Sequence, residues 1–247
     1  MKLYHELAEY YYALEEKHRN IDDDISLIES LLKHKKNPSL LDLGCGTGEH
    51  LFKLSKTGIK CTGIDASNSM LRIAKLRFPD SIEFKNEDMR FINFNKKFDL
   101  VISLFGSFNY ITEDADINKV FKNTWDALKP DGIGLFEIWN SIPILKIKEK
   151  PVTKVSKINY RGKEIERERG FKLLNNMNKT LVEVDYNYII SRNENIKDRH
   201  LMRAFTKDEI ADFIIDNGFR ICNIFSNTLE EPYNPISNAI VIQFQKV

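Results

Sequence analysis

Glycines at a fixed spacing give the sequence its strongest chemical signal. They belong to the segment Asp42-Leu43-Gly44-Cys45-Gly46-Thr47-Gly48, which stands between a short apolar run and a stretch with helical spacing. Glycine has no Cβ and adopts positive φ readily, so a ligand can approach the backbone of Gly44 and Gly46 closely. The free N–H groups that open the following helix would face the same ligand. This context is typical of a nucleotide-binding turn between a first strand and a first helix.

The spacing also separates the kinds of ligand. The pattern is G-x-G-x-G and not G-x-G-x-x-G, because Glu49 follows Gly48. It favours a ligand without phosphates over a pyrophosphate, and it disfavours a nicotinamide-dependent oxidoreductase. Asp65 ends the next predicted strand, where its carboxylate could accept hydrogen bonds from both hydroxyls of an adenosine ribose. An ordinary turn carboxylate is the alternative for Asp65, and its register with the glycines favours ligand binding.

Strands and helices that alternate along the chain must position these residues. Short apolar runs that predict buried parallel strands are residues 39–43, 60–65, 82–85, 98–104 and 133–139. Helical spacing is found in residues 1–33 (two helices), 47–56, 69–78, 114–128 and, after a capping box, 206–217. Two closing strands are predicted at 219–226 and 239–245. We therefore expect an α/β fold with a doubly wound, mostly parallel, Rossmann-like seven-stranded sheet and N-terminal helices.

Residues 142–205 interrupt this rhythm, because no convincing helix is found there. Residues 182–190 alternate along the chain as a half-buried strand does, and 164–174 and 196–205 are its expected antiparallel neighbours. We expect an inserted antiparallel β cap over the carboxyl edge of the parallel sheet. The expected parts are a helical lid (1–35), a Rossmann-like ligand domain (36–141 and 206–247) and a β-rich substrate cap (142–205).

Composition narrows the partners and the compartment. The 247 residues carry 37 Lys and Arg against 36 Asp and Glu, so no global field draws the protein to nucleic acid or to a membrane. The basic cluster from Lys146 to Lys157 is interpreted as a solvated strand and loop. No signal-peptide pattern and no membrane-spanning run is found, and the three cysteines are scattered. We expect a cytoplasmic protein without a bound metal; its oligomeric state stays open, a homodimer included.

Five motifs in order give the chain a family resemblance. Besides the glycine segment they are Gly63-Ile64-Asp65-Ala66-Ser67, Asn86-Glu87-Asp88-Met89-Arg90, Phe98-Asp99-Leu100-Val101-Ile102-Ser103 and Leu128-Lys129-Pro130-Asp131-Gly132. With them the chain resembles the class I S-adenosylmethionine-dependent methyltransferases, over roughly residues 36–140 and the last helix and strands. The resemblance implies S-adenosyl-L-methionine as cofactor and S-adenosyl-L-homocysteine as product.

The same resemblance assigns roles to individual residues. Gly44 and Gly46 line the methionine moiety and Asp65 holds the ribose. Asp88 meets the adenine amine with the Met89 backbone beside the ring, and Ser103 lies where the methyl group points. A turn cap is the alternative for Asp88. Further residues expected along the cofactor are Asp42, Cys45, Ala66 and Met70. Cys45 is interpreted there as a small filler and Met70 as a side chain with a core role.

The residues expected around the methyl acceptor are inferred from a resemblance to one branch of this family. Helix residues near Tyr11, the segment around Tyr110, the cap and His200 look like the N,N-dimethyltransferases of nucleotide-linked aminosugars. By position, Tyr11 and Tyr110 would border the methyl-transfer site and His200 would come from the cap. Tyr110 stands where aminosugar enzymes can carry a histidine, which leaves the sugar and the base open. For Tyr11 a packed aromatic residue, and for His200 a satisfied polar contact, are the structural alternatives.

The sequence thus favours a methyltransferase that acts on a small molecule. An amine bound in its neutral form needs no strong base, whereas an alcohol would want one, and no compelling His–carboxylate pair is visible in the sequence. We therefore expect an amine, with a nucleotide-linked aminosugar as one candidate. The alternatives are an O-methyltransferase of a small metabolite and a non-catalytic cofactor-binding module. The Asn/Asp-Pro-Pro-aromatic signature of amino-group DNA methyltransferases is absent after the fourth strand, where Ser103-Leu104-Phe105-Gly106 stands.

Overall fold

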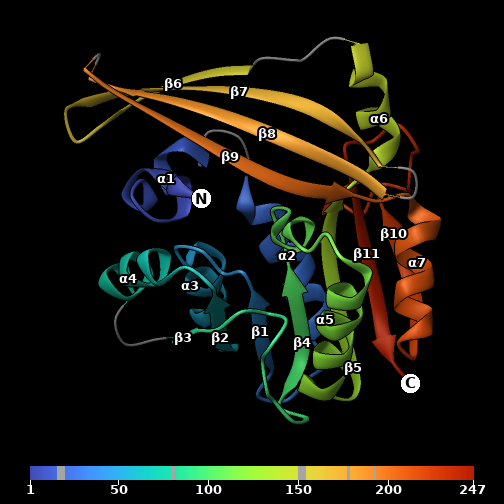
Figure 1. Cartoon of the computed structure of the whole chain (residues 1–247). Coiled ribbons are helices and arrows are strands. Elements are labelled where there is room, and N and C mark those ends of the chain that lie inside the picture. The colour runs from blue at the N-terminus through green and yellow to red at the C-terminus, as the bar shows by residue number, and fades with distance from the viewer. Residues whose placement is uncertain (16–19, 79–81, 150–153, 177–178, 192) are drawn as a thin grey trace.

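Two sheets make up the architecture of the computed structural model, which describes residues 1–15, 20–78, 82–149, 154–176, 179–191 and 193–247 (Figure 1). The larger sheet has seven strands in the order β10-β11-β5-β4-β1-β2-β3, and the smaller has four in the order β6-β7-β8-β9. The expected α/β fold with a seven-stranded, mostly parallel sheet and a separate antiparallel sheet is confirmed.

The seven-stranded sheet is parallel at its centre. Its strands are β1 (Ser39–Leu43), β2 (Lys60–Asp65), β3 (Glu83–Asn86), β4 (Phe98–Ser103), β5 (Leu128–Trp139), β10 (Phe219–Phe225) and β11 (Ala239–Lys246). β1 pairs in parallel with both β2 and β4, so the chain reverses its direction of winding at β1. In open α/β sheets a ligand binds beyond the carboxyl ends of the strands at such a switch point.

Helices cover both faces of this sheet. They are α2 (Ile21–Leu32), α3 (Glu49–Ser55), α4 (Asn68–Arg77), α5 (Asp114–Ala127) and α7 (Lys207–Asp216). Local capping fixes several starts: the Ser67 hydroxyl accepts from Met70 N at 3.3 Å, and Thr206 and Glu209 form the expected capping box of α7. Apolar residues of α5 and α7 pack on one face, and those of α2 and α3 pack on the other.

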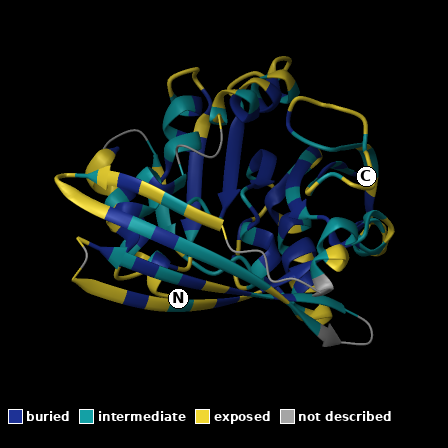
Figure 2. Ribbon diagram, turned by 90° about the horizontal axis from the view of Figure 1, so that it is seen from above, coloured by how far each residue is buried: buried dark blue, intermediate teal, exposed yellow. Residues whose placement is uncertain are grey.

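The four-stranded sheet is a twisted antiparallel layer over the carboxyl ends of the parallel strands (Figure 1). Its strands are β6 (Lys154–Tyr160), β7 (Lys163–Asn176), β8 (Lys179–Ile190) and β9 (Glu194–Ala204). From Val182 to Ile190, buried residues of β8 alternate with residues that are half-buried or exposed, and Figure 2 shows a similar alternation of colours in the sheet. The buried face of this sheet packs on the short helix η1 (Lys2–Tyr4) and on α1 (Ala8–Glu15). The N-terminal residues therefore lie between the two sheets.

Two segments differ from the sequence-based expectation. β5 begins before the strand expected at 133–139, because residues 129–132 also lie within it. Its register against β4 shifts between Phe98 and Leu100. The region expected to lack helix begins with α6 (Ser141–Leu145) and the 3-10 helix η4 (Lys146–Glu149). The Asn140 side chain caps α6 by accepting a hydrogen bond from Ile142 N at 3.1 Å. This local helix signal was missed because the residues that follow have the pattern of strands. Between the strands expected at 164–174 and 182–190 we also expect a turn at 175–179, of which residues 177 and 178 lie outside the described residues.

No helix in the described part of the chain is long and apolar enough to cross a membrane.

Candidate functional site

The glycine turn approaches its neighbours so closely that side chains are excluded. Gly44 and Gly46 have φ values of 85° and 56°, in the left-handed region that favours glycine. A Cβ added to Gly44 would lie 2.7 Å from Ser107 Cβ, and one added to Gly46 would lie 3.3 Å from Met70 Cε. Ser107 belongs to the 3-10 helix η3 (Ser107–Tyr110), which follows β4. The turn therefore offers bare backbone beside the carboxyl ends of β1 and β4.

Asp65 is held at the end of β2 by backbone donors. Its Oδ2 accepts from Gly46 N at 2.9 Å and its Oδ1 accepts from Ser67 N at 2.7 Å. Burial raises the pKa of Asp65, and the donors Ser67 N and Gly46 N oppose that rise. Each carboxylate oxygen has lone pairs beyond these two hydrogen bonds, so the group can accept further donors from a ligand.

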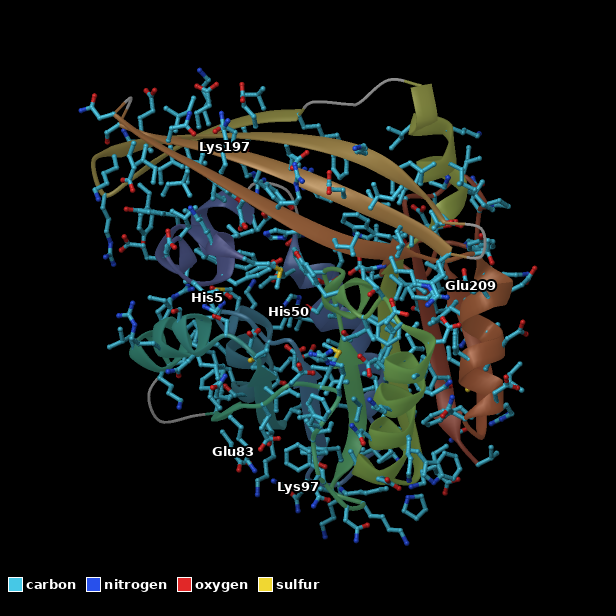
Figure 3. All side chains as sticks on the ribbon, in the orientation of Figure 1. His5, His50, Glu83, Lys97, Lys197 and Glu209 are labelled. Atoms are coloured by element: carbon cyan, nitrogen blue, oxygen red, sulfur yellow. The ribbon has the colours of Figure 1, made fainter. Side chains whose placement is uncertain are left out.

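A cavity of about 400 Å³ joins the glycine turn, Asp65 and the N-terminal residues. This volume is typical of a small-molecule site. The sequence-predicted residues that line it are Tyr11, Gly44, Gly46, Asp65, Ala66, Met70, Asp88, Met89 and Tyr110. His5 also lines the cavity, and Figure 3 shows this histidine between the two sheets, with Glu83 and Lys97 toward the opposite end of the large sheet.

Asp88 is engaged by a neighbouring guanidinium. Arg90 Nη2 donates to Asp88 Oδ2 at 2.6 Å, and Arg90 N and Nε donate to Asp88 Oδ1 at 2.9 and 3.0 Å. Burial raises the pKa of Asp88, but these Arg90 contacts outweigh it and keep the pKa below its ordinary value. The Asp88 carboxylate is thus ionised and held at the cavity wall. Met89 is the next residue, and its backbone carbonyl accepts a hydrogen bond from Asn123 Nδ2 at 3.1 Å.

A smaller cavity of about 70 Å³ also borders Tyr11, Gly44 and Gly46. Asp42 and Cys45 line it together with His50. Burial raises the pKa of Asp42 to about 7, although His50 opposes the rise. Burial also raises the pKa of the Cys45 thiol, which agrees with the interpretation of Cys45 as a filler rather than a nucleophile.

Three tyrosines converge from separate parts of the chain. The Tyr4 ring centroid lies 5.7 Å from that of Tyr11 and 5.8 Å from that of Tyr110. The Tyr4 and Tyr110 hydroxyls are 2.7 Å apart. The Ser67 hydroxyl donates to the Tyr4 carbonyl, so the N-terminal segment is anchored to the loop that carries Asp65. All three tyrosines line the larger cavity.

His200 of β9 lies behind Tyr110 and pairs with a carboxylate. His200 Nδ1 is 2.6 Å from Tyr110 Oη, and His200 Nε2 is 2.9 Å from Asp198 Oδ2. Leu3 N donates to the same Asp198 oxygen at 2.8 Å. A His–carboxylate pair was not recognised from the sequence, although two residues on a strand separated by one point to the same face. His200 itself is 1% exposed and lines neither cavity.

Ser103 is not brought into the site. Its buried hydroxyl donates to Leu43 O at 3.2 Å and borders neither cavity. Four other residues, to which the sequence analysis assigned no role, contribute to the site. Ser107 lies against Gly44, Tyr4 belongs to the tyrosine group, Ser67 caps α4, and Asp198 pairs with His200. The Asp198-x-His200 spacing was the one signal that could have found Asp198; the others depend on contacts between distant segments.

With this geometry in place, comparison with known proteins gives a consistent result. A family model described as a methyltransferase domain matches residues 40–132. YqeM of Bacillus subtilis, named a methyltransferase without a stated acceptor, is 38% identical over 133 residues, 53% of either chain. The dTDP-3-amino-3,4,6-trideoxy-alpha-D-glucopyranose N,N-dimethyltransferase of Streptomyces venezuelae is 34% identical over 101 residues, 41% of this chain and 42% of that protein. The matches thus span about half the length of these relatives or less.

Likeness in fold extends further than likeness in sequence. The crystal structure of an S-adenosylmethionine-dependent methyltransferase from Clostridium acetobutylicum matches with a TM-score of 0.80 over 98% of both chains, at 20% identity. At this identity the match concerns the fold, and it includes the region of the four-stranded sheet.

Proposed function

We propose that this chain, whose residues 40–132 form a methyltransferase domain with the fold of the S-adenosylmethionine-dependent class, transfers a methyl group from S-adenosyl-L-methionine to a small-molecule amine. The observation that carries the proposal is one cavity lined by the glycine turn, by Asp65 and by Tyr11 and Tyr110. Cofactor-type and acceptor-type residues thus face the same space.

The residues present fit the cofactor. A Cβ at Gly44 would meet Ser107 and one at Gly46 would approach Met70, so the turn keeps bare backbone where the methionine moiety is proposed to lie. Asp65 retains acceptor capacity for the ribose hydroxyls. Asp88 and the Met89 backbone are proposed to meet the adenine. Asp42, Cys45, Ala66 and Met70 would border the ligand. Two carboxylates at the larger cavity, Asp65 and Asp88, suit a ligand that carries positive charge.

The protein's contribution is mainly alignment. When bound, the cofactor would supply an electrophilic methyl group to the acceptor's lone pair and would keep the carbon–sulfur electron pair on sulfur. The tyrosine wall and the N-terminal segment would hold the acceptor nucleophile in line and keep water out. Orientation of this kind lowers the activation barrier by about 7–11 kcal/mol in favourable cases.

We accordingly assign residues 1–35 as a lid, 36–141 with 206–247 as the cofactor domain and 142–205 as a substrate cap.

Two acceptor classes are compatible with the site. Relatives named as N,N-dimethyltransferases of nucleotide-linked aminosugars favour an amine, of which an aminosugar is one candidate. The His200–Asp198 pair supplies a base that the sequence alone did not reveal, so a small alcohol is the second candidate. For either class, Tyr11 and Tyr110 are proposed to border the reacting group.

Ligand-dependent stability followed by an acceptor screen tests the proposal. S-Adenosylhomocysteine should raise the melting temperature of the protein, since it binds the folded state, whereas NADH should not. Amines and alcohols are then screened with radiolabelled S-adenosylmethionine. Stabilisation by NADH alone would refute the assignment. Binding without methyl transfer to any compound would indicate a non-catalytic module.

A further inference from the structure

Four polar side chains are hydrogen-bonded end to end between the larger cavity and β9. Tyr4 Oη lies 2.7 Å from Tyr110 Oη, Tyr110 Oη lies 2.6 Å from His200 Nδ1, and His200 Nε2 lies 2.9 Å from Asp198 Oδ2. The two tyrosines line the cavity, whereas the His200 and Asp198 side chains are 0% and 6% exposed. A continuous row of exchangeable protons therefore connects the cavity to a shielded carboxylate.

The Asp198 carboxylate determines which group donates and which accepts in each of these hydrogen bonds. Burial raises the pKa of Asp198, but the Leu3 N–H and His200 donors outweigh it and hold the pKa below its ordinary value. An ionised carboxylate only accepts, so His200 Nε2 carries the hydrogen. Burial lowers the pKa of His200 below its ordinary 6.5 even though Asp198 opposes this, so the imidazole is neutral at pH 7 and Nδ1 is bare. Tyr110 must then donate to His200 and accept from Tyr4.

We propose that Tyr4, Tyr110 and His200 form a proton path that takes the proton released by the methyl acceptor, and that Asp198 positions His200 for this role. This inference rests on the proposed function. Tyr4 lines the cavity and its oxygen keeps a lone pair, so it is the group that meets the acceptor's N–H or O–H.

Each step of the path moves one proton and leaves both tyrosines neutral. The acceptor proton passes to Tyr4 Oη as the Tyr4 hydrogen passes to Tyr110 Oη and the Tyr110 hydrogen to His200 Nδ1. The products are an imidazolium and the Asp198 carboxylate, which stabilises it. Concerted transfer is favoured because burial raises the pKa of Tyr4 and of Tyr110 well above the ordinary value, which makes a free tyrosinate costly.

The path predicts an acid limb in the pH profile. Only neutral His200 accepts a proton, so kcat/KM should fall as the pH drops through the His200 pKa. Asp198→Asn removes the charge that raises this pKa and frees the other tautomer, so the limb should move to lower pH and kcat should fall. The titratable or charged groups that face His200 are Asp198 from β9, Tyr4 and the N-terminal ammonium of Met1, Tyr110 from η3, and Tyr186 from β8.

Variants separate this role from packing. Tyr4→Phe, His200→Gln and Asp198→Asn should each lower kcat/KM by about 100-fold or more, with S-adenosylhomocysteine affinity within a few-fold of wild type. Tyr188→Phe is the matched control, because the Tyr188 hydroxyl is buried in the same cluster without a hydrogen-bond partner among the described residues. That variant should keep both the activity and the acid limb.

Nitrogen NMR of the imidazoles tests the path without an acceptor. Wild-type His200 should show the Nε2–H tautomer and a pKa below 6.5, and Asp198→Asn should show mixed tautomers. An Nδ1–H tautomer in the wild type, or full activity of Tyr4→Phe, would overturn the path. Failure of the proposed function would be seen differently, as a lack of S-adenosylhomocysteine binding. The His200 tautomer tests the proton path whether or not the protein binds that ligand.

Discussion

The Asp65 carboxylate and the Gly46 backbone N–H are joined by a hydrogen bond of 2.9 Å that ties the end of β2 to the glycine turn. A second oxygen of the same carboxylate holds Ser67 N, whose residue caps α4. One side chain thus fixes two neighbouring loops of the larger cavity and still faces the space where a ribose is proposed. Asp65 is therefore the most informative position at which to test the cofactor site.

Asp65→Ala should weaken S-adenosylhomocysteine binding by about 1.5–3 kcal/mol, because hydrogen bonds to a charged acceptor are lost. That loss corresponds to roughly a 10- to 150-fold rise in Kd by titration calorimetry. Asp212→Ala, on the exposed side of α7, is the control and should bind as wild type does. An unchanged Kd for Asp65→Ala in a folded protein would remove Asp65 from the site.

Two glycines with nearly equal backbone geometry separate strain from close approach. Gly44 and Gly58 have φ values of 85° and 87°, but a Cβ at Gly58 meets nothing within 4 Å. Gly58→Ala should therefore cost only the left-handed backbone, about 1–2 kcal/mol in unfolding free energy. Gly44→Ala should cost about 1–3 kcal/mol more, because its Cβ collides with Ser107 and η3 must shift.

Ligand binding completes this comparison. Gly44→Ala should lose at least about tenfold in S-adenosylhomocysteine affinity, whereas Gly58→Ala should bind normally. Urea unfolding and calorimetry on both variants give the result. Equal stability and equal affinity of the two variants would mean that the Gly44 turn tolerates a side chain and that the ligand passes elsewhere.

The same substitution should have a large effect on stability at one arginine of β9 and little effect at another. Arg203 is 2% exposed and donates to Thr112 O at 2.9 Å and to Glu209 Oε1 at 2.6 Å. Arg203→Ala should lower the free energy of unfolding by about 1.5–3 kcal/mol, because charged hydrogen bonds and packing are lost. Arg199 is 66% exposed, and its ion pairs with Asp185 and Glu183 are solvated. Arg199→Ala should leave the stability nearly unchanged in the same denaturation experiment. Similar losses in both would contradict the burial argument.

Asp42 should make the protein less stable as the pH rises from 3.8 to about 7. Burial raises its pKa from 3.8 to about 7, so the folded protein holds a proton that the unfolded chain has released. Between these values the unfolded state binds fewer protons, and the free energy of unfolding falls as the pH rises. Asp42→Asn removes this penalty, so its stability relative to wild type should increase by about 2–3 kcal/mol between pH 5 and pH 8. Denaturation without ligand at both pH values measures this; a difference that does not change with pH would show that Asp42 is ionised in the folded state.

Local patterns in the sequence were sufficient for most of the fold. The capping box at Thr206 and Glu209, the apolar face of α5 and the alternation in β8 each depend on residues a few positions apart, and the structure has all three. Parallel strands that alternate with helices further restrict the order of the large sheet, because crossover connections are right-handed and short. The same reasoning missed α6, where a brief helix precedes a long stretch of strand.

Which side chains meet was decided by the tertiary structure. The sequence named the residue types of the cofactor motifs because the turn between β1 and α3 and the end of β2 are local features. It could not join Tyr4 to Tyr110, or Tyr110 to His200, since these pairs are separated by 106 and 90 residues and meet only where the antiparallel sheet crosses the parallel strands. Nor could it turn Ser103 away from the cavity toward Leu43 O. Periodicity tells which face of an element a residue occupies. The packing of one sheet over another decides what that face touches, and here it placed His200 and Asp198 behind Tyr110.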